Sequence, residues 1–98
     1  MEPLTHNPAV EGIGTQVIAN GVRGLAGGTA ASAEVTALAP AGADEVSAQA
    51  ALAFAAEGAQ TLATNALAQE ELARTGAAFI EASAIYAAAD AANASTLA

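Results

Sequence analysis

The sequence contains no cysteine and only two basic residues, Arg23 and Arg74. Without cysteine, neither a disulfide nor a thiolate metal site can form, and this absence is compatible with an extracellular destination without proving one. The ten acidic residues give a formal net charge of −8. This charge argues against nucleic acid or an anionic membrane surface as a partner and favours a basic surface on another protein.

Long apolar runs are also missing. No stretch of about 20 bulky apolar residues occurs, so we expect no membrane-spanning helix. The first residues, from Met1 to His6, lack both a basic stretch and an apolar stretch. We therefore expect no secretory signal peptide at this end.

Residues for catalysis are scarce. His6 is the sole histidine, and neither a Ser-His-Asp nor a Cys-His set is available. The adjacent acids Asp44-Glu45 and Glu70-Glu71 are not an acid/base pair across a cleft; we expect Glu70 to pair with Arg74 one helical turn on. The sequence thus predicts a protein that is not an enzyme, with no cofactor and no metal site.

Alanine dominates what is present. It makes up about a third of the residues, whereas valine, isoleucine, leucine, phenylalanine and tyrosine together number 20. Alanine has the best helix propensity but buries little surface, and a single small domain is only marginally stable. We therefore expect one all-α domain over residues 1–98 that depends on association with a partner.

The positions of proline, glycine and capping residues predict two helices. Asn7 is a good N-cap and Pro8 suits the first helical position, so the first helix should span about 8–38. Pro40 and Gly42 break the helix in a loop at 39–43. Asp44 then caps a second helix over about 44–92, followed by a short tail. A short loop makes the helices antiparallel neighbours, and the second, at roughly 70 Å against roughly 45 Å, must extend beyond the first.

Each predicted helix carries more apolar surface than a two-helix hairpin can bury. Apolar residues occur on several faces, as expected for helices that have several neighbours in a bundle. We therefore predict a hairpin that completes a four-helix bundle with a partner chain. The predicted partner interface comprises Val10, Ile13, Val17, Val22, Leu25, Phe54, Leu62, Leu72 and Phe79.

Three glycines in the first predicted helix recur at a spacing of seven: Gly14, Gly21 and Gly28. This spacing returns them to nearly the same face. Together they should cost a few kcal/mol of helix stability relative to alanine. Two interpretations remain open: close backbone packing against a facing helix, or mere tolerance because alanine over-stabilises the helix.

The chain's single tyrosine, Tyr86, precedes Asp90 by four residues. At this spacing an aromatic ring and a carboxylate share one helix face. The pair looks like the Y-x-x-x-[DE] export signal of type VII secretion substrates. Because the motif is short, an aromatic anchor beside a solvated acid is the alternative.

The order of these features resembles the N-terminal domain of the mycobacterial PE family, over essentially the whole chain. The most specific part runs from Val35 to Ala51 and includes Asp44-Glu45-Val46-Ser47; Ile13 to Val17 and Asn7-Pro8 add to it. The likeness is greatest to the short PE protein encoded in the first ESX type VII secretion cluster. One departure is that the family's Pro-Glu dipeptide is here Pro8-Ala9, with an acid only at Glu11.

The resemblance implies a mechanism. PE domains pair one to one with a PPE-family protein to form a four-helix bundle, and an EspG-type chaperone holds the PPE chain at its remote tip. The pair assembles in the cytosol and is exported folded by the ESX machinery, to the medium or the cell surface. On this likeness Tyr86 and Asp90 are the export signal. A structural alanine-rich helical subunit that self-assembles is the competing interpretation. An ice-binding helix is disfavoured because the threonines lack a regular spacing.

Overall fold

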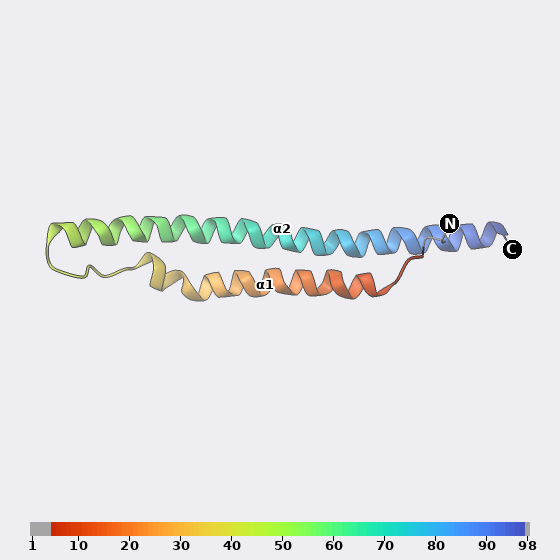
Figure 1. The fold of residues 1–98 in the computed structure, drawn as a ribbon, viewed down its shortest axis with the longest axis horizontal. Helices are drawn as coiled ribbons and strands as arrows, with labels where there is room; N and C mark the ends of the chain where they lie inside the picture. Colours follow the sequence, from red (N-terminus) through yellow and green to blue (C-terminus); the bar gives the residue numbers. More distant parts are fainter. Residues whose placement is uncertain (1–4, 98) are drawn as a thin grey trace.

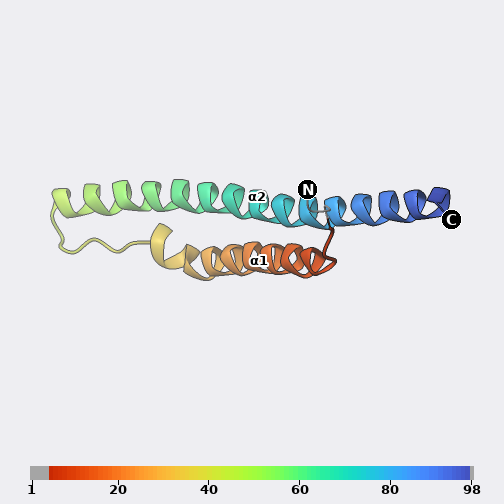
Figure 2. The same cartoon turned by 45° about the vertical axis from the view of Figure 1, so that its right-hand side comes forward.

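The chain forms an extended hairpin of two antiparallel helices (Figures 1 and 2). The computed structural model describes residues 5–97, in which helix α1 spans Ala9–Thr36 and helix α2 spans Glu45–Leu97. The molecule measures 82 × 22 × 19 Å. The predicted all-helical hairpin is therefore confirmed. The expectation about the N-terminal segment falls mostly on residues 1–4, outside the described residues.

A hydrogen bond from the backbone to the Asn7 side chain marks the start of helix α1. The Ala9 N–H donates to Asn7 Oδ1 at 3.0 Å, and Pro8 already has helical angles, with φ −59° and ψ −15°. Proline at this point loses nothing, because the first N–H groups of a helix have no partner within it. Sequence and structure thus agree on this start to within one residue.

The connection between the helices, residues 37–44, is longer than the predicted loop. Helix α1 ends at Thr36 rather than near residue 38, and Ala37 leaves the helical region with φ −114° and ψ 52°. Pro40 keeps the residue before it out of the helical region, which explains why the helix is not resumed.

Asp44 caps the second helix. Its carboxylate accepts hydrogen bonds from the hydroxyl of Ser47 at 2.8 Å and from the Ser47 N–H at 3.0 Å. These bonds to the side chain and backbone of Ser47 favour the ionised form and lower the pKa of the Asp44 carboxyl below its usual value. The negative charge also complements the positive end of the helix dipole.

Helix α2 continues to Leu97 rather than ending near residue 92. The alanine-rich stretch after Tyr86 contains no glycine or proline that would end it. The last turns of α2 extend past the start of α1, at the blue end of the ribbon (Figure 1).

The two helices touch through glycine. Gly14 and Gly76 are both buried and face each other. A Cβ built on Gly14 would lie 2.6 Å from the carbonyl oxygen of Gly76, and one built on Gly76 would lie 2.5 Å from that of Gly14. Gly21 approaches the carbonyl oxygen of Gln69 in the same way, with a Cβ separation of 2.9 Å. Side chains at these positions would force the backbones apart.

Gly28 faces a side chain of α2 instead of its backbone. A Cβ on Gly28 would lie 2.6 Å from Nδ2 of Asn65. The same amide donates to the carbonyl oxygen of Gly24 at 3.2 Å and its Oδ1 accepts from Gln69 Nε2 at 3.0 Å. This part of the helix contact is therefore polar, and small residues on α1 leave room for it.

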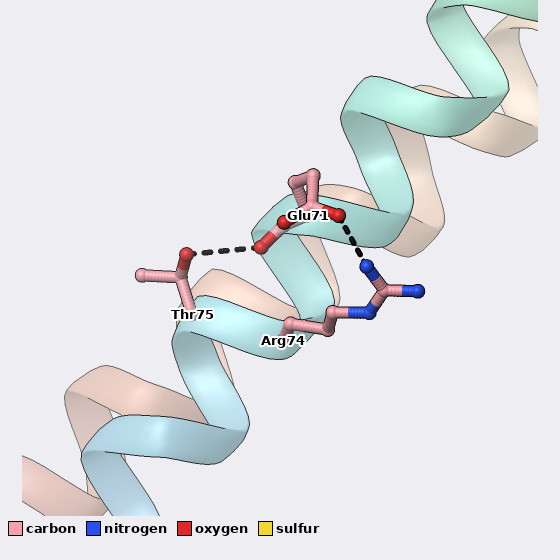
Figure 3. A network of polar contacts seen from close by, with 3 residues as sticks. All are labelled: Glu71, Arg74 and Thr75. Atoms are coloured by element: carbon pink, nitrogen blue, oxygen red, sulfur yellow. Dashed lines mark hydrogen bonds and ion pairs between the residues drawn. The ribbon is translucent and has the colours of Figure 1, made fainter.

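Glu71, Arg74 and Thr75 form a small group of polar contacts on the exposed surface of α2 (Figure 3). Arg74 pairs with Glu71, three residues before it, and the Thr75 hydroxyl donates to the Glu71 carbonyl oxygen at 2.9 Å. The expected pairing of Arg74 with Glu70 was wrong, because positions three and four residues away are equally near neighbours on a helix. Both side chains are largely exposed, so the pair contributes little to stability.

The hairpin has no apolar core in the part that the structure describes. No large apolar side chain there is fully buried, and the only side chain below 2% exposure is that of Ser83. Exposed large apolar residues occur along both helices, from Ile13 on α1 to Leu97 at the end of α2. Glycines, the amides of Asn65 and Gln69 and partly buried isoleucines such as Ile18 and Ile80 make the contacts between the helices. Many of the bulky apolar side chains are exposed.

Candidate recognition surface at the end of the hairpin

Tyr86 and Asp90 lie near the end of α2 that extends past the start of α1. Glu11, in the first turn of α1, comes level with Ser83 of α2, so Tyr86 and Asp90 lie beside the very start of α1, where Val10 lines the same hollow. Asp90 is exposed, and half of the Tyr86 surface is accessible. The structure thus brings the ring and the carboxylate together on an accessible helix end.

The segment before α1 covers part of this end. The residues just before Ala9 cross from the start of α1 to α2, as both ribbon views show (Figures 1 and 2). There the His6 ring stacks on Tyr86, with ring centroids 5.6 Å apart and planes inclined by 17°. Tyr86 is therefore part of an aromatic pair and not an isolated ring.

A buried serine anchors His6. Ser83 Oγ lies 3.0 Å from His6 Nε2 and 3.3 Å from Glu11 Oε1. An ionised carboxylate only accepts, so the serine hydroxyl donates to Glu11 and accepts from His6. This arrangement requires a proton on Nε2 of His6 and orients the ring against Tyr86.

A hollow of about 340 Å³ lies beside the stacked rings. The Asp90 side chain and residues of the N-terminal segment line it. Its full lining is Thr5, His6, Asn7, Val10, Tyr86 and Asp90.

Sequence reasoning placed Tyr86 and Asp90 on one surface, and it predicted Val10 as a partner contact and Asn7 as a helix cap without placing them beside that pair. It left His6 without a role after excluding a metal, and it gave Ser83 none. No local pattern marks either residue, because they are far apart in sequence and meet only through the register of the antiparallel helices.

The predicted interface residues fall into two groups. Three are half-buried: Val10, Val17 and Leu62. The remaining six are exposed: Ile13, Val22, Leu25, Phe54, Leu72 and Phe79. The hairpin therefore covers some of these side chains only in part and leaves most of them open.

Two further properties bear on the functional class. Within residues 5–97, no group of three or more His, Cys, Asp or Glu side chains is placed to hold a metal ion. Neither α1 nor α2, as described, has a stretch apolar enough to cross a membrane.

Comparison with known proteins identifies the family. The sequence model of the PE family matches residues 4–93. An uncharacterized PE family protein of Mycolicibacterium smegmatis, PE35, is 68% identical over 97 residues, covering 99% of this chain and all of the relative. A protein described as PE family immunomodulator PE35 in two Mycobacterium tuberculosis strains is 55% identical over 76 residues, which is 78% of this chain and 78% or 77% of the relative. No solved structure matches significantly.

The chain therefore belongs to the PE family. The resemblance drawn from the loop, the caps and the Tyr86–Asp90 spacing is confirmed at the level of the family and of a short PE protein. The exposed apolar side chains of α1 and α2 then raise the question of which molecule covers them.

Proposed function

We propose that this chain is the non-catalytic PE half of a one-to-one heterodimer with a PPE-family protein. The observation that carries the proposal is the absence of any fully buried large apolar side chain among the described residues. Two helices from the partner, packed against α1 and α2, would complete a four-helix bundle and cover the exposed apolar residues.

Energetics favour such a partner. Fully burying a valine, leucine, isoleucine or phenylalanine side chain contributes about 1.5–3 kcal/mol. On α2, Leu72 and Phe79 lie seven residues apart and are 40% and 41% exposed. This spacing keeps them on nearly one face, so a single partner helix laid along this part of α2 would reach both.

The proposed heterodimer is a substrate of an ESX type VII secretion system. Tyr86 and Asp90 serve as the export signal, supported by their exposure near the end of α2 that extends past the start of α1. An EspG-type chaperone acts on this chain only indirectly, through the PPE protein. The folded pair leaves the cytosol and is released or kept at the cell surface.

Co-expression with candidate PPE proteins tests the pairing. A tag on one chain should retain the other through size-exclusion chromatography, and light scattering should give a mass equal to one copy of each. Discrete homo-oligomers of this chain alone, with no PPE protein retained, would support the self-assembling structural subunit instead.

Charged substitutions in the predicted interface should block assembly. Phe54→Glu and Val17→Glu each place a charge where burial is expected, and an unpaired buried charge costs several kcal/mol. Gln60→Glu adds the same charge at an exposed polar position of α2 and should leave binding unchanged. The measurement is retention of the PPE chain in a pull-down. Retention by both Phe54→Glu and Val17→Glu would show that the faces are wrongly assigned.

A further inference from the structure

Among the described residues, no lysine or arginine lies at the end of the hairpin that carries Asp90. After Arg74 the sequence contains Glu81 and Asp90 and neither lysine nor arginine. Among the described residues the one ion pair joins Glu71 to Arg74, on the outer face of α2. The carboxylate on the rim of the hollow is therefore available to a positive group from another molecule.

Hydrogen bonds to the buried Ser83 fix the His6 ring, which lines the same hollow. Ser83 is 1% exposed, so no other protein can touch its hydroxyl. Its bonds to His6 and Glu11 tie the N-terminal segment to α2 and hold the His6 ring parallel to Tyr86. Fixing a ring in advance lowers the entropic cost of binding to it.

We propose that His6, Tyr86 and Asp90 form one composite surface that receives an arginine side chain from the protein that recognises the export signal. This inference rests on the proposed export function and extends it in two ways. It adds His6 as a contact residue and Ser83 as a positioning residue, and it gives the chemistry of the group that is bound.

Arginine fits the hollow better than other side chains. Its guanidinium forms paired hydrogen bonds with a carboxylate and packs flat against aromatic rings. Asp90 supplies the carboxylate, and His6 and Tyr86 supply the rings, all on the lining of one hollow. Lysine would satisfy the charge but not the planar stacking.

Export of the heterodimer tests the composite surface. His6→Ala should lower the amount in culture filtrate about two- to fivefold, as expected for the loss of one exposed contact between a ring and a cation. His6→Phe keeps a ring and should restore part of the export. Ser83→Ala should also reduce export, although the receptor cannot touch this side chain. In all three variants the heterodimer should still assemble, with only a small fall in melting temperature from the lost stacking or hydrogen bonds.

The outcomes separate this inference from the export function itself. Normal export of His6→Ala, with export lost in Tyr86→Ala and Asp90→Ala, would overturn the composite surface alone. Normal export of His6→Ala, Tyr86→Ala and Asp90→Ala would overturn the export signal. Loss of heterodimer assembly in His6→Ala would show that His6 acts in folding or pairing, which also overturns the inference.

Nuclear magnetic resonance tests the bound group directly. Tyr86 and His6 are the sole tyrosine and histidine of the chain, so ring labels in this chain, paired with an unlabelled partner, give unambiguous signals. A capped Gly-Arg-Gly peptide should shift both signals saturably, and the citrulline analogue, which lacks the charge, should not. His6→Ala should weaken arginine-peptide binding about two- to fivefold. Equal shifts with both peptides, or none, would overturn the assignment of arginine.

Discussion

Replacing Tyr86 or Asp90 by alanine is expected to remove the heterodimer from culture filtrate while leaving it in the cell lysate. Asp90 is exposed, so Asp90→Ala should leave assembly intact. Tyr86→Ala removes a half-exposed ring that stacks on His6, and should cost somewhat more stability without preventing pairing. Export should nevertheless fail in both, because the recognised face loses either its ring or its charge.

Matched variants make this prediction specific. Asp90→Glu keeps the acid and should still be exported, and Glu81→Ala, which removes another exposed acid of α2, should have no effect. The measurement is the amount of both chains in filtrate and lysate. Normal export of Tyr86→Ala and Asp90→Ala would refute the signal. Loss of the variants from lysate as well would mean that the two residues are structural.

Gly76→Ala is the second substitution with a large expected effect. Its methyl group would lie 2.5 Å from the Gly14 carbonyl oxygen and 2.6 Å from Ile18 Cγ1. Backbone atoms cannot yield as a flexible side chain would, so the helices must separate. Overpacking of this kind typically costs about 1–3 kcal/mol, which is a large fraction of the stability of a small domain.

Two other glycines provide the control. Nothing lies within 4 Å of a Cβ built on Gly12 or Gly27. Alanine at either helical position should stabilise the protein by about 0.5–1 kcal/mol, because glycine in a helix costs that much. Thermal or urea unfolding of the heterodimer measures all three. Equal stability of Gly76→Ala and Gly12→Ala would show that the helices do not approach closely at Gly14.

The helices themselves follow from the sequence because their determinants are local. Alanine content, the Asn7 cap and the Asp44 cap act within a few residues, as does Pro40 in ending a helix. The predicted helix bounds therefore differ from the observed ones mainly at the C-terminal ends of the helices, where no capping residue marks the boundary. Helix α2 extends to Leu97 because nothing after Tyr86 stops it.

Contacts between the helices were less predictable because they depend on register. Gly76 is an isolated glycine in the sequence, yet it lies against Gly14 in a close backbone contact between the helices. His6 and Ser83 are likewise unremarkable in sequence and meet only when the antiparallel helices are aligned. The spacing of Tyr86 and Asp90, by contrast, lies within one helix, so their common face was predictable. Their role in export stays a prediction.

The need for a partner follows from burial rather than from any motif. The helices contain enough apolar residues for a bundle, but the hairpin leaves most of them exposed, including Phe54 at 65%. Two helices that bury no large apolar side chain fully have little apolar burial to offset the loss of conformational entropy. A second pair of helices would supply the missing burial.

Thermal unfolding of the chain alone and with its PPE partner, followed by circular dichroism and light scattering, tests the central claim most directly. The proposed heterodimer predicts that the isolated chain aggregates or lacks a cooperative transition, whereas the one-to-one complex unfolds cooperatively. An isolated chain that stays monomeric and melts cooperatively well above about 50 °C, as ordinary stable domains do, would contradict the claim that this hairpin is half of a bundle.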